Sequence, residues 1–155
     1  MPEPYPPLSE HPFLAGIGDK HLSRLGGCCR ATLLTFQPGY QIFREGQDAD
    51  ACYLLEDGDV ALQVYAPGAK PRTIETLHGG DVLGWSWLFP PYRWTFDATT
   101  LTEVRAIGLN AGLLRQAKDD DLEFGYELMR RFSMVVVDRL QAARLRLMDM
   151  YAART

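Results

Sequence analysis

Between residues 32 and 109 the chain alternates short apolar runs with turn residues. Four runs show this most clearly: 32–36, 53–55, 60–65 and 73–77. The dipeptide Asp57-Gly58 between two of them is a strong hairpin signal, because Asp-Gly readily adopts the positive φ of a tight turn. Strands of about five residues with turns every 8 to 12 residues are typical of a sandwich, jelly roll or barrel. We expect a β-roll over about 30–110.

After Asn110 the apolar residues change to a helical period. They recur at steps of three and four from Leu122 to Met150 and form one apolar seam. The pattern predicts a long helix over about 120–152, roughly 45 Å in length. The acidic residues 119–121 suit its N-terminus through the helix dipole. A helix this long cannot bury its whole seam against one compact roll, so we expect it to pair with its own copy in a homodimer.

The N-terminal segment divides into two parts. Prolines recur through residues 1–11, which predicts an extended arm because proline interrupts both helices and central strands. Apolar residues from Leu14 to Leu25 then follow a helical spacing, with Asp19 near a helix start and Gly26-Gly27 as its interruption. We therefore predict an arm over 1–11 and a single domain over 12–155, with short helices before the roll.

Composition narrows the class of protein. The 155 residues suffice to bury one core without disulfides, and no stretch approaches the roughly 20 apolar residues of a membrane span. The start lacks a basic segment followed by an apolar one, so we expect no secretory signal and a cytoplasmic location. The net charge of −4 gives no broad attraction to nucleic-acid phosphates. We interpret the arginines near the C-terminus as a solvated helix face.

The sequence offers no set of catalytic or metal-binding residues. Three cysteines are an odd number, and Cys28 and Cys29 are adjacent, so a disulfide framework is not indicated. The three histidines are scattered, which removes a zinc pattern. An enzyme of the cupin-like jelly-roll class would need clustered histidines, yet only His78 lies among the predicted strands. We expect a protein that is not an enzyme and holds no metal.

Five segments carry a family resemblance when they are taken in order. They are His11–Leu14, Pro38-Gly39 followed by Ile42–Gly46, Tyr53–Gly58, Gly79–Gly84 and Arg139–Gln141. With them the chain resembles the cyclic-nucleotide-binding domain family, the sensor half of catabolite-activator-like regulators, from about residue 11 to 150. The resemblance implies a mainly β fold: a β-roll of the double-stranded jelly-roll type with short N-terminal helices and a long C-terminal dimerisation helix. Transcription factors of this family continue into a winged helix-turn-helix, whereas this sequence ends at Thr155, so we expect no direct DNA binding.

The resemblance also implies a phosphate-binding cassette that starts at Gly84. In such a cassette backbone amides at a turn bind the phosphate, an arginine pairs with its charge, and a carboxylate next to the glycine binds a ribose hydroxyl. Here Trp85 takes the place of the carboxylate, and the arginine corresponds to Arg93, with the register ambiguous by one residue. A ligand hydroxyl without its partner costs about 1 to 3 kcal/mol. We therefore predict weak or absent binding of cyclic AMP.

All three tryptophans fall within ten residues of each other in this cassette, together with Phe89, Tyr92 and Phe96. The candidate ligand-binding residues are Gly84, Trp85, Ser86, Trp87, Arg93, Trp94, Thr95 and, on the last helix, Arg144. Ser86, Arg93 and Thr95 would be the polar anchors of an anionic ligand, and the indole rings would stack on a planar one. The same rings could instead fill the cavity.

Two hypotheses for the function follow. In the first, the protein is a regulatory domain that senses a small molecule, a cyclic nucleotide or another anionic effector, and signals through its dimer helix. In the second, it is a ligand-free dimeric module that binds a protein partner and has an aromatic-filled, degenerate pocket. Saturable binding of a small molecule discriminates between them.

Overall fold

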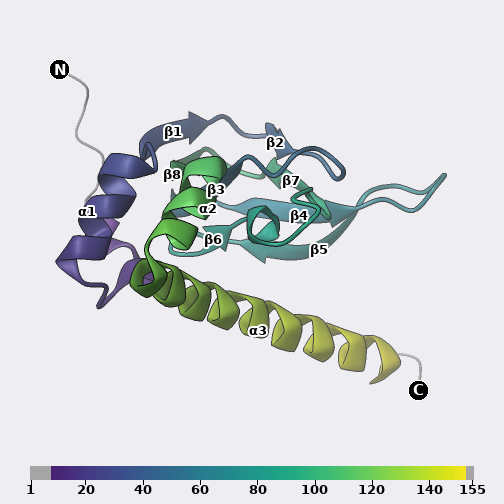
Figure 1. Ribbon diagram of the computed structural model, residues 1–155. Helices are drawn as coiled ribbons and strands as arrows, with labels where there is room; N and C mark the ends of the chain where they lie inside the picture. Colours follow the sequence, from purple (N-terminus) through teal and green to yellow (C-terminus); the bar gives the residue numbers. More distant parts are fainter. Residues whose placement is uncertain (1–7, 153–155) are drawn as a thin grey trace.

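A computed structural model describes residues 8–152 and shows two antiparallel sheets with a long helix beneath them (Figure 1). One four-stranded sheet has the order β1-β8-β3-β6 and the other the order β2-β7-β4-β5. The strands are β1 (Thr32–Phe36), β2 (Gln41–Phe43), β3 (Ala51–Asp57), β4 (Val60–Val64), β5 (Arg72–Leu77), β6 (Val82–Leu83), β7 (Asp97–Thr100) and β8 (Val104–Asn110). The predicted β-roll is confirmed, and its core contains buried side chains from both sheets.

The helices lie at the two ends of the chain, apart from one short turn between β6 and β7. They are the 3-10 helices η1 (Leu8–Glu10), η2 (Pro12–Leu14) and η3 (Ser86–Leu88), and the α-helices α1 (Asp19–Cys28), α2 (Ala111–Asp120) and α3 (Leu122–Ala152). Residues 1–7 of the predicted arm lie outside the described residues, and its last residues form η1.

The N-terminal helix differs from its prediction at both ends. It starts at Asp19, with Gly18 at the N-cap, and it continues through Gly26 and Gly27. A glycine inside a helix costs about 1 kcal/mol relative to alanine, which weakens a helix without ending it. Buried Leu25 and Cys29 hold this last turn against the roll. The prediction that the glycine pair interrupts the helix is therefore wrong.

Asp57-Gly58 forms the turn between β3 and β4, but the predicted hairpin is wrong, because the two strands lie in different sheets: β3 pairs with β6 and β8, and β4 pairs with β5 and β7. Gly58 has a φ of +99°, and a Cβ atom there would collide with the backbone of Glu103 and Val104. Glycine is required at this position for both reasons, since only glycine adopts this φ readily and leaves this space free.

The C-terminal helical region divides at Asp121. This residue is extended, with a φ of −128°, and its Oδ1 accepts a hydrogen bond of 3.2 Å from the Phe124 amide. This bond lowers the pKa of the Asp121 carboxyl, because it stabilises the charged form. Asp121 thus ends α2 through its extended backbone and caps α3 through its side chain, as its place at the predicted helix start suggests.

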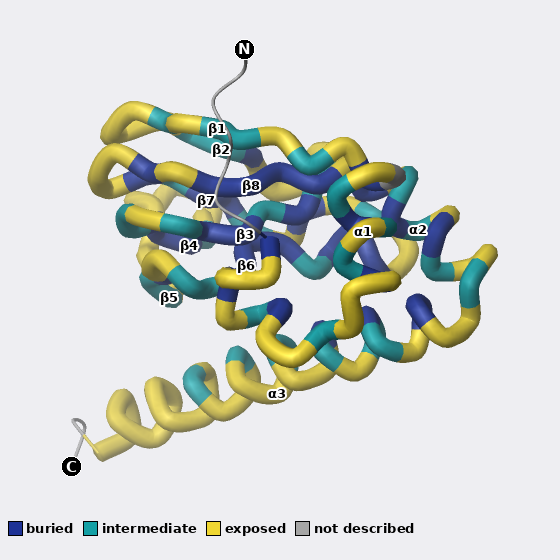
Figure 2. Tube along the Cα trace, turned by 90° about the vertical axis from the view of Figure 1, so that its left-hand side faces the viewer, coloured by how far each residue is buried: buried dark blue, intermediate teal, exposed yellow. Residues whose placement is uncertain are grey.

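The first half of α3 packs against the body and the second half does not. The buried residues of α3 are Phe124, Gly125, Leu128 and Phe132. Two arginines then attach the helix to backbone carbonyls: Arg131 donates to Phe13, at 2.8 Å, and Arg139 donates to Val82, at 2.6 Å. From residue 143 to 152 every residue is exposed, which Figure 2 shows as a continuous yellow end.

Candidate ligand pocket

A cavity of about 300 Å³ lies between the β4–β5 side of the roll and the middle of α3. We call it the sheet–helix cavity. Its lining residues are Leu62, Ile74, Glu75, Trp85, Phe96, Val136, Arg139, Leu140, Ala142, Ala143 and Arg146. They come from three parts of the fold: strands β4 and β5, the segment 84–97 between β6 and β7, and α3. We call 84–97 the cassette, because it contains most of the residues singled out from the sequence.

The walls of this cavity are mainly apolar and partly aromatic. The cassette contributes Trp85 and Phe96, whose side chains are both half-buried. Trp85 also packs edge-on against Phe89, with 6.3 Å between the ring centroids. Opposite the cassette, small side chains at Ala142 and Ala143 leave room beside the helix. The volume lies at the lower end of the range that small-molecule sites occupy.

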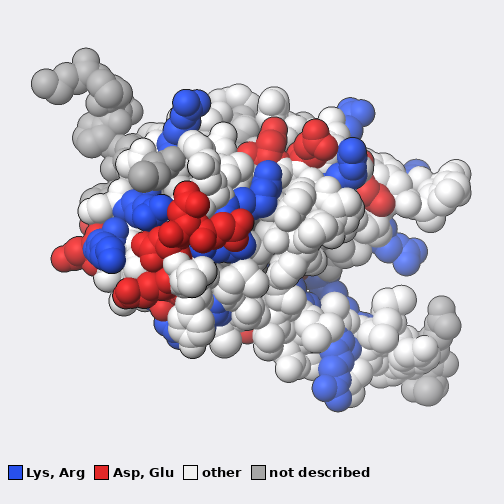
Figure 3. Space-filling view, viewed as in Figure 1, with Lys and Arg blue, Asp and Glu red and all other residues white. Residues whose placement is uncertain are grey.

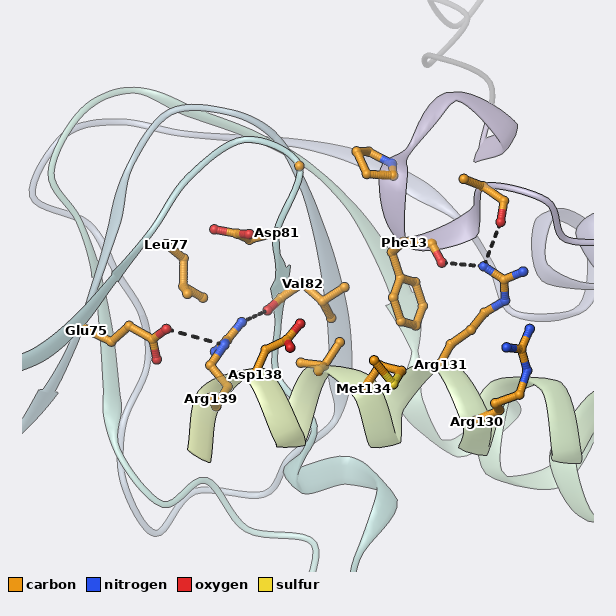
Figure 4. A pocket seen from close by; sticks show the side chains of 14 residues that line it. Phe13, Glu75, Leu77, Asp81, Val82, Arg130, Arg131, Met134, Asp138 and Arg139 are labelled. Atoms are coloured by element: carbon orange, nitrogen blue, oxygen red, sulfur yellow. Dashed lines mark hydrogen bonds and ion pairs between the residues drawn. The ribbon is translucent and has the colours of Figure 1, made fainter. Parts of the chain in front are cut away.

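The charged side chains of the cavity are Glu75, Arg139 and Arg146. Glu75 and Arg139 form an ion pair of 3.5 Å, in which both side chains are largely buried. Arg139 also donates its hydrogen bond to the Val82 carbonyl, so the guanidinium is held between a carboxylate and a backbone acceptor (Figure 4). Arg146 is exposed on the last turns of α3.

The same ion pair borders a second cavity of about 520 Å³ on the side of the N-terminal helices (Figure 4). Phe13, Asp81, Met134 and Asp138 are among its lining residues. Glu75 and Arg139 line both cavities, so their contact separates one from the other.

Gly84 starts the cassette with a φ of +101° and is buried. A Cβ atom there would lie 2.7 Å from the Trp94 ring. Trp94 in turn stacks on Phe43, with 3.8 Å between centroids and 7° between planes. The glycine thus leaves room for an indole of the same chain, and Trp94 packs in the core instead of at the sheet–helix cavity.

Trp87 is fully buried and also belongs to the core. Its Nε1 donates to the Gly84 carbonyl, at 3.1 Å, and its ring packs edge-on against Phe132 of α3, at 5.1 Å. Burial raises the pKa of the neighbouring Cys52 thiol, whose contact with Trp87 acts in the opposite direction. Arg115 of α2 donates to the Trp87 carbonyl and lies over the Tyr92 ring. The cassette is therefore tied to α2 and α3 through packed groups.

Arg93 and Thr95 are exposed, on the opposite side of the backbone from Trp94. Arg93 and Trp94 pair with residues 46–49 around an isolated antiparallel bridge, and in such strand-like pairing consecutive side chains point to opposite faces. Arg93 donates to the Gly46 carbonyl, at 2.9 Å, and lies 3.5 Å from the Asp48 carboxylate. Neither Arg93 nor Thr95 lines the sheet–helix cavity.

The remaining candidates, Ser86 and Arg144, also lie outside the lining of the sheet–helix cavity. Ser86 is buried, and its hydroxyl has no hydrogen-bond partner among the described residues. Arg144 is exposed on α3 outside the cavity lining. Of the eight candidates the structure thus brings only Trp85 to this cavity, with Gly84 next to it in the chain. Ligand binding by these residues stays a prediction.

Ten of the eleven residues that line the cavity were absent from the candidates, among them Glu75, Phe96 and Arg139. Phe96 and Arg139 belonged to the aromatic cluster and to the Arg139–Gln141 motif, so a signal for them existed. Glu75 had no such signal in the sequence, because β4 and β5 change register between Leu62 and Gln63, and no residue pattern predicts such a bulge.

Charge is unevenly distributed over the surface. In the view of Figure 3, acidic and basic side chains gather where α1, α2 and the start of α3 lie, whereas the projecting part of α3 is largely uncharged. Among residues 8–152, no helix combines the length and apolar character that crossing a membrane requires. Within the same range, no three His, Cys, Asp or Glu side chains are grouped as metal ligands.

Comparison with known proteins identifies relatives of regulatory type. The family model for the cyclic nucleotide-binding domain matches residues 33–121. A CRP-like cAMP-activated global transcriptional regulator of Mycobacterium tuberculosis is 30% identical over 115 residues, which are 74% of this chain. The chain spans 50% of the length of that regulator.

Two further matches extend the comparison. Glutaminase 1 of Bradyrhizobium diazoefficiens is 28% identical over 138 residues, which are 88% of this chain and only 21% of that enzyme. The crystal structure of a Geobacter metallireducens GS-15 protein assigned to cyclic nucleotide binding has a TM-score of 0.73 and 28% identity. The match covers 83% of this chain and 91% of that one.

Proposed function

The chain belongs to the cyclic nucleotide-binding domain family, and on this premise we propose that it is a regulatory domain that senses a small molecule and signals through α3 in a homodimer. The work proposed is binding and signalling, without catalysis. The cassette is divergent, since Trp85 stands where the family resemblance implies a ribose-binding carboxylate.

The observation that carries the proposal is the position of the sheet–helix cavity. One wall is the cassette, through Trp85 and Phe96, and the other is the middle of α3, through Ala142 and Ala143. A molecule in this cavity contacts both at once. Its affinity therefore depends on where α3 lies, and a ligand that binds one helix position better than another shifts α3 toward that position.

The output of the sensor is the exposed half of α3. Apolar side chains continue along it beyond the cavity, at Leu147 and Tyr151, with exposures of 56% and 66%. Together with Val137, Leu140 and Arg144 they follow alternating steps of three and four, the spacing of a two-stranded coiled coil. A second copy of the chain is the partner we propose for this seam.

The test is a screen of thermal stability with metabolites that include cyclic AMP and cyclic GMP. Ala143→Trp fills the cavity from the helix side, and Gln141→Trp places the same side chain on α3 outside the cavity lining. A ligand at about 100 times its Kd should raise the Tm of the wild type and of Gln141→Trp by about 5 to 10 °C. Ala143→Trp should abolish the shift. Hydrogen exchange over residues 143–152 should change with the same ligand.

The proposal would be contradicted if no metabolite raised the Tm of the wild type, or if every such shift persisted in Ala143→Trp. It would favour the alternative, a ligand-free dimeric module for a protein partner. The burial of Trp87 and Trp94 in the core favours that alternative. The cavity beside Trp85 favours the sensor, since the indoles leave it open.

A further inference from the structure

We propose, resting on the function proposed above, that the sheet–helix cavity binds an uncharged planar molecule that donates a hydrogen bond to Glu75. The ligand class follows from how the charges of the cavity are already used and from the side chains that form its walls. It differs from the anionic effector that the sequence suggested.

Arg139, the largely buried cation of the cavity, already has its partners within the chain. Arg139 contacts the Glu75 carboxylate at 3.5 Å and the Val82 carbonyl at 2.6 Å, and only 15% of its side chain is exposed. An anion that took Arg139 as its partner would leave the Glu75 carboxylate, itself 23% exposed, without its counter-charge. An unpaired charge in such a place is strongly unfavourable. The cavity therefore discriminates against a buried anion.

The other arginines do not change this balance. Arg93 points away and pairs with Asp48 and the Gly46 carbonyl. Arg146 lines the cavity but is exposed on α3, and ion pairs of exposed side chains contribute little because water and salt screen them. The buried part of the ligand thus meets no unpaired cation among the described residues.

The walls select a flat apolar body. Trp85 and Phe96 present aromatic surface from the cassette, Leu62 lies on the strand side, and Val136 and Ala142 lie on the helix side. Aromatic walls favour planar ligands, because offset stacking adds to the burial of apolar area. About 300 Å³ accommodates a molecule of two or three fused rings.

One polar group is available to orient that body. The only contact of the Glu75 carboxylate with a polar side chain among residues 8–152 is the ion pair with Arg139. A carboxylate can accept several hydrogen bonds, so Glu75 retains the capacity to accept one from a ligand hydroxyl or amine. A hydrogen bond to an ionised acceptor is stronger than one to a neutral acceptor.

Calorimetry with three matched probes tests the inference. The probes are 2-naphthol, which is uncharged and has a donor, 2-methylnaphthalene, which has no donor, and 2-naphthoate, which is an anion at pH 7. The wild type should bind 2-naphthol about threefold to tenfold more tightly than 2-methylnaphthalene and more than about tenfold more tightly than 2-naphthoate. Ala143→Trp should abolish all binding.

Glu75→Gln provides the decisive variant. It keeps an acceptor but removes the counter-charge of Arg139, so 2-naphthoate should gain at least about tenfold in affinity while 2-naphthol changes little. Asp81→Asn is the matched control, because Asp81 lines the neighbouring cavity only, and it should leave all affinities unchanged.

Three results would overturn the ligand class. The first is binding of 2-naphthoate to the wild type as tightly as 2-naphthol. The second is binding of the anion that is lost in Arg146→Gln, which would make the rim arginine an anchor. In both of these the sensor function would stand, since a small molecule still occupies the cavity. The third is binding of none of the probes, after which the metabolite screen decides separately whether the sensor function also fails.

Discussion

At the scale of single residues, Gly84 combines two constraints that act on the cassette. Its φ is +101°, and a Cβ atom there would lie 2.7 Å from the Trp94 ring, so both the backbone and the packing exclude a side chain. We expect Gly84→Ala to lower the free energy of unfolding by about 2 to 4 kcal/mol, as backbone strain and overpacking add. Gly39→Ala is the control, since Gly39 has a φ of +79° but open space around it. If urea titrations gave equal losses of unfolding free energy for both variants, the contact with the Trp94 ring would contribute nothing to the cost.

His78 gives a residue-scale prediction for pH. A hydrogen bond of 2.7 Å to Asp59 raises the pKa of His78, so the protonated ring stabilises the fold. This contribution is complete below the unfolded pKa of about 6.5 and is lost as the pH rises through the raised folded pKa. Asp59→Asn should therefore destabilise more at pH 5.5 than at pH 9, by urea unfolding.

The control for this pair is Asp57→Asn, which removes an exposed carboxylate that does not contact His78. It should leave the His78 titration, followed by NMR, unchanged. An unshifted titration in Asp59→Asn as well would show that the hydrogen bond does not set the pKa.

At the scale of elements, the contact between α2 and α3 overrides helix propensity at Gly125. A Cβ atom there would collide with the Lys118 carbonyl at the end of α2. We expect Gly125→Ala to destabilise by about 1 to 3 kcal/mol, although alanine is the better helix former. Gly27→Ala in α1 meets open space and should stabilise by about 0.5 to 1 kcal/mol. Chemical denaturation should show a loss of stability for Gly125→Ala and a gain for Gly27→Ala. A gain in both variants would refute the close approach of the Lys118 carbonyl to Gly125.

The elements themselves were largely predictable, because their signals are local. The run 32–36 coincides with β1, and Asp57-Gly58 forms a turn, although the strands on its two sides lie in different sheets and form no hairpin. The errors arise where packing decides. Gly26 and Gly27 stay helical because neighbouring residues are buried, and the helical region divides at Asp121, whose carboxylate caps the second helix. Helix propensity alone predicts neither feature.

The candidate site was less predictable, since it depends on elements far apart in the chain. Strand-like pairing with residues 46–49 directs Arg93 to solvent and Trp94 into the core. Glu75 reaches the cavity beside a bulge, and Arg139 meets it from α3. Only Trp85 was assigned to a ligand and also lines the cavity. Side-chain direction in an irregular segment follows from tertiary pairing, which a sequence pattern does not encode.

At the scale of the whole molecule, dimerisation through α3 can be tested without touching the cavity. Leu147 and Tyr151 lie on the exposed seam and are not cavity residues. In the double variant Leu147→Glu, Tyr151→Glu, like charges would face each other across the two-fold axis, and we expect association to weaken by at least about a hundredfold. Analytical ultracentrifugation should show a dimer for the wild type and a monomer for the variant.

Leu101→Glu separates this effect from a general change of the surface. Leu101 is 53% exposed and lies in the bend between β7 and β8, so its loss removes an apolar side chain and adds a charge away from α3. We expect this variant to remain dimeric. Because Leu147 and Tyr151 lie beyond the cavity residues of α3, a monomeric double variant should still bind a cavity ligand but should no longer transmit the signal to a second copy. A dimer that persists in the double variant would exclude the distal half of α3 as the interface and with it the proposed route of the signal.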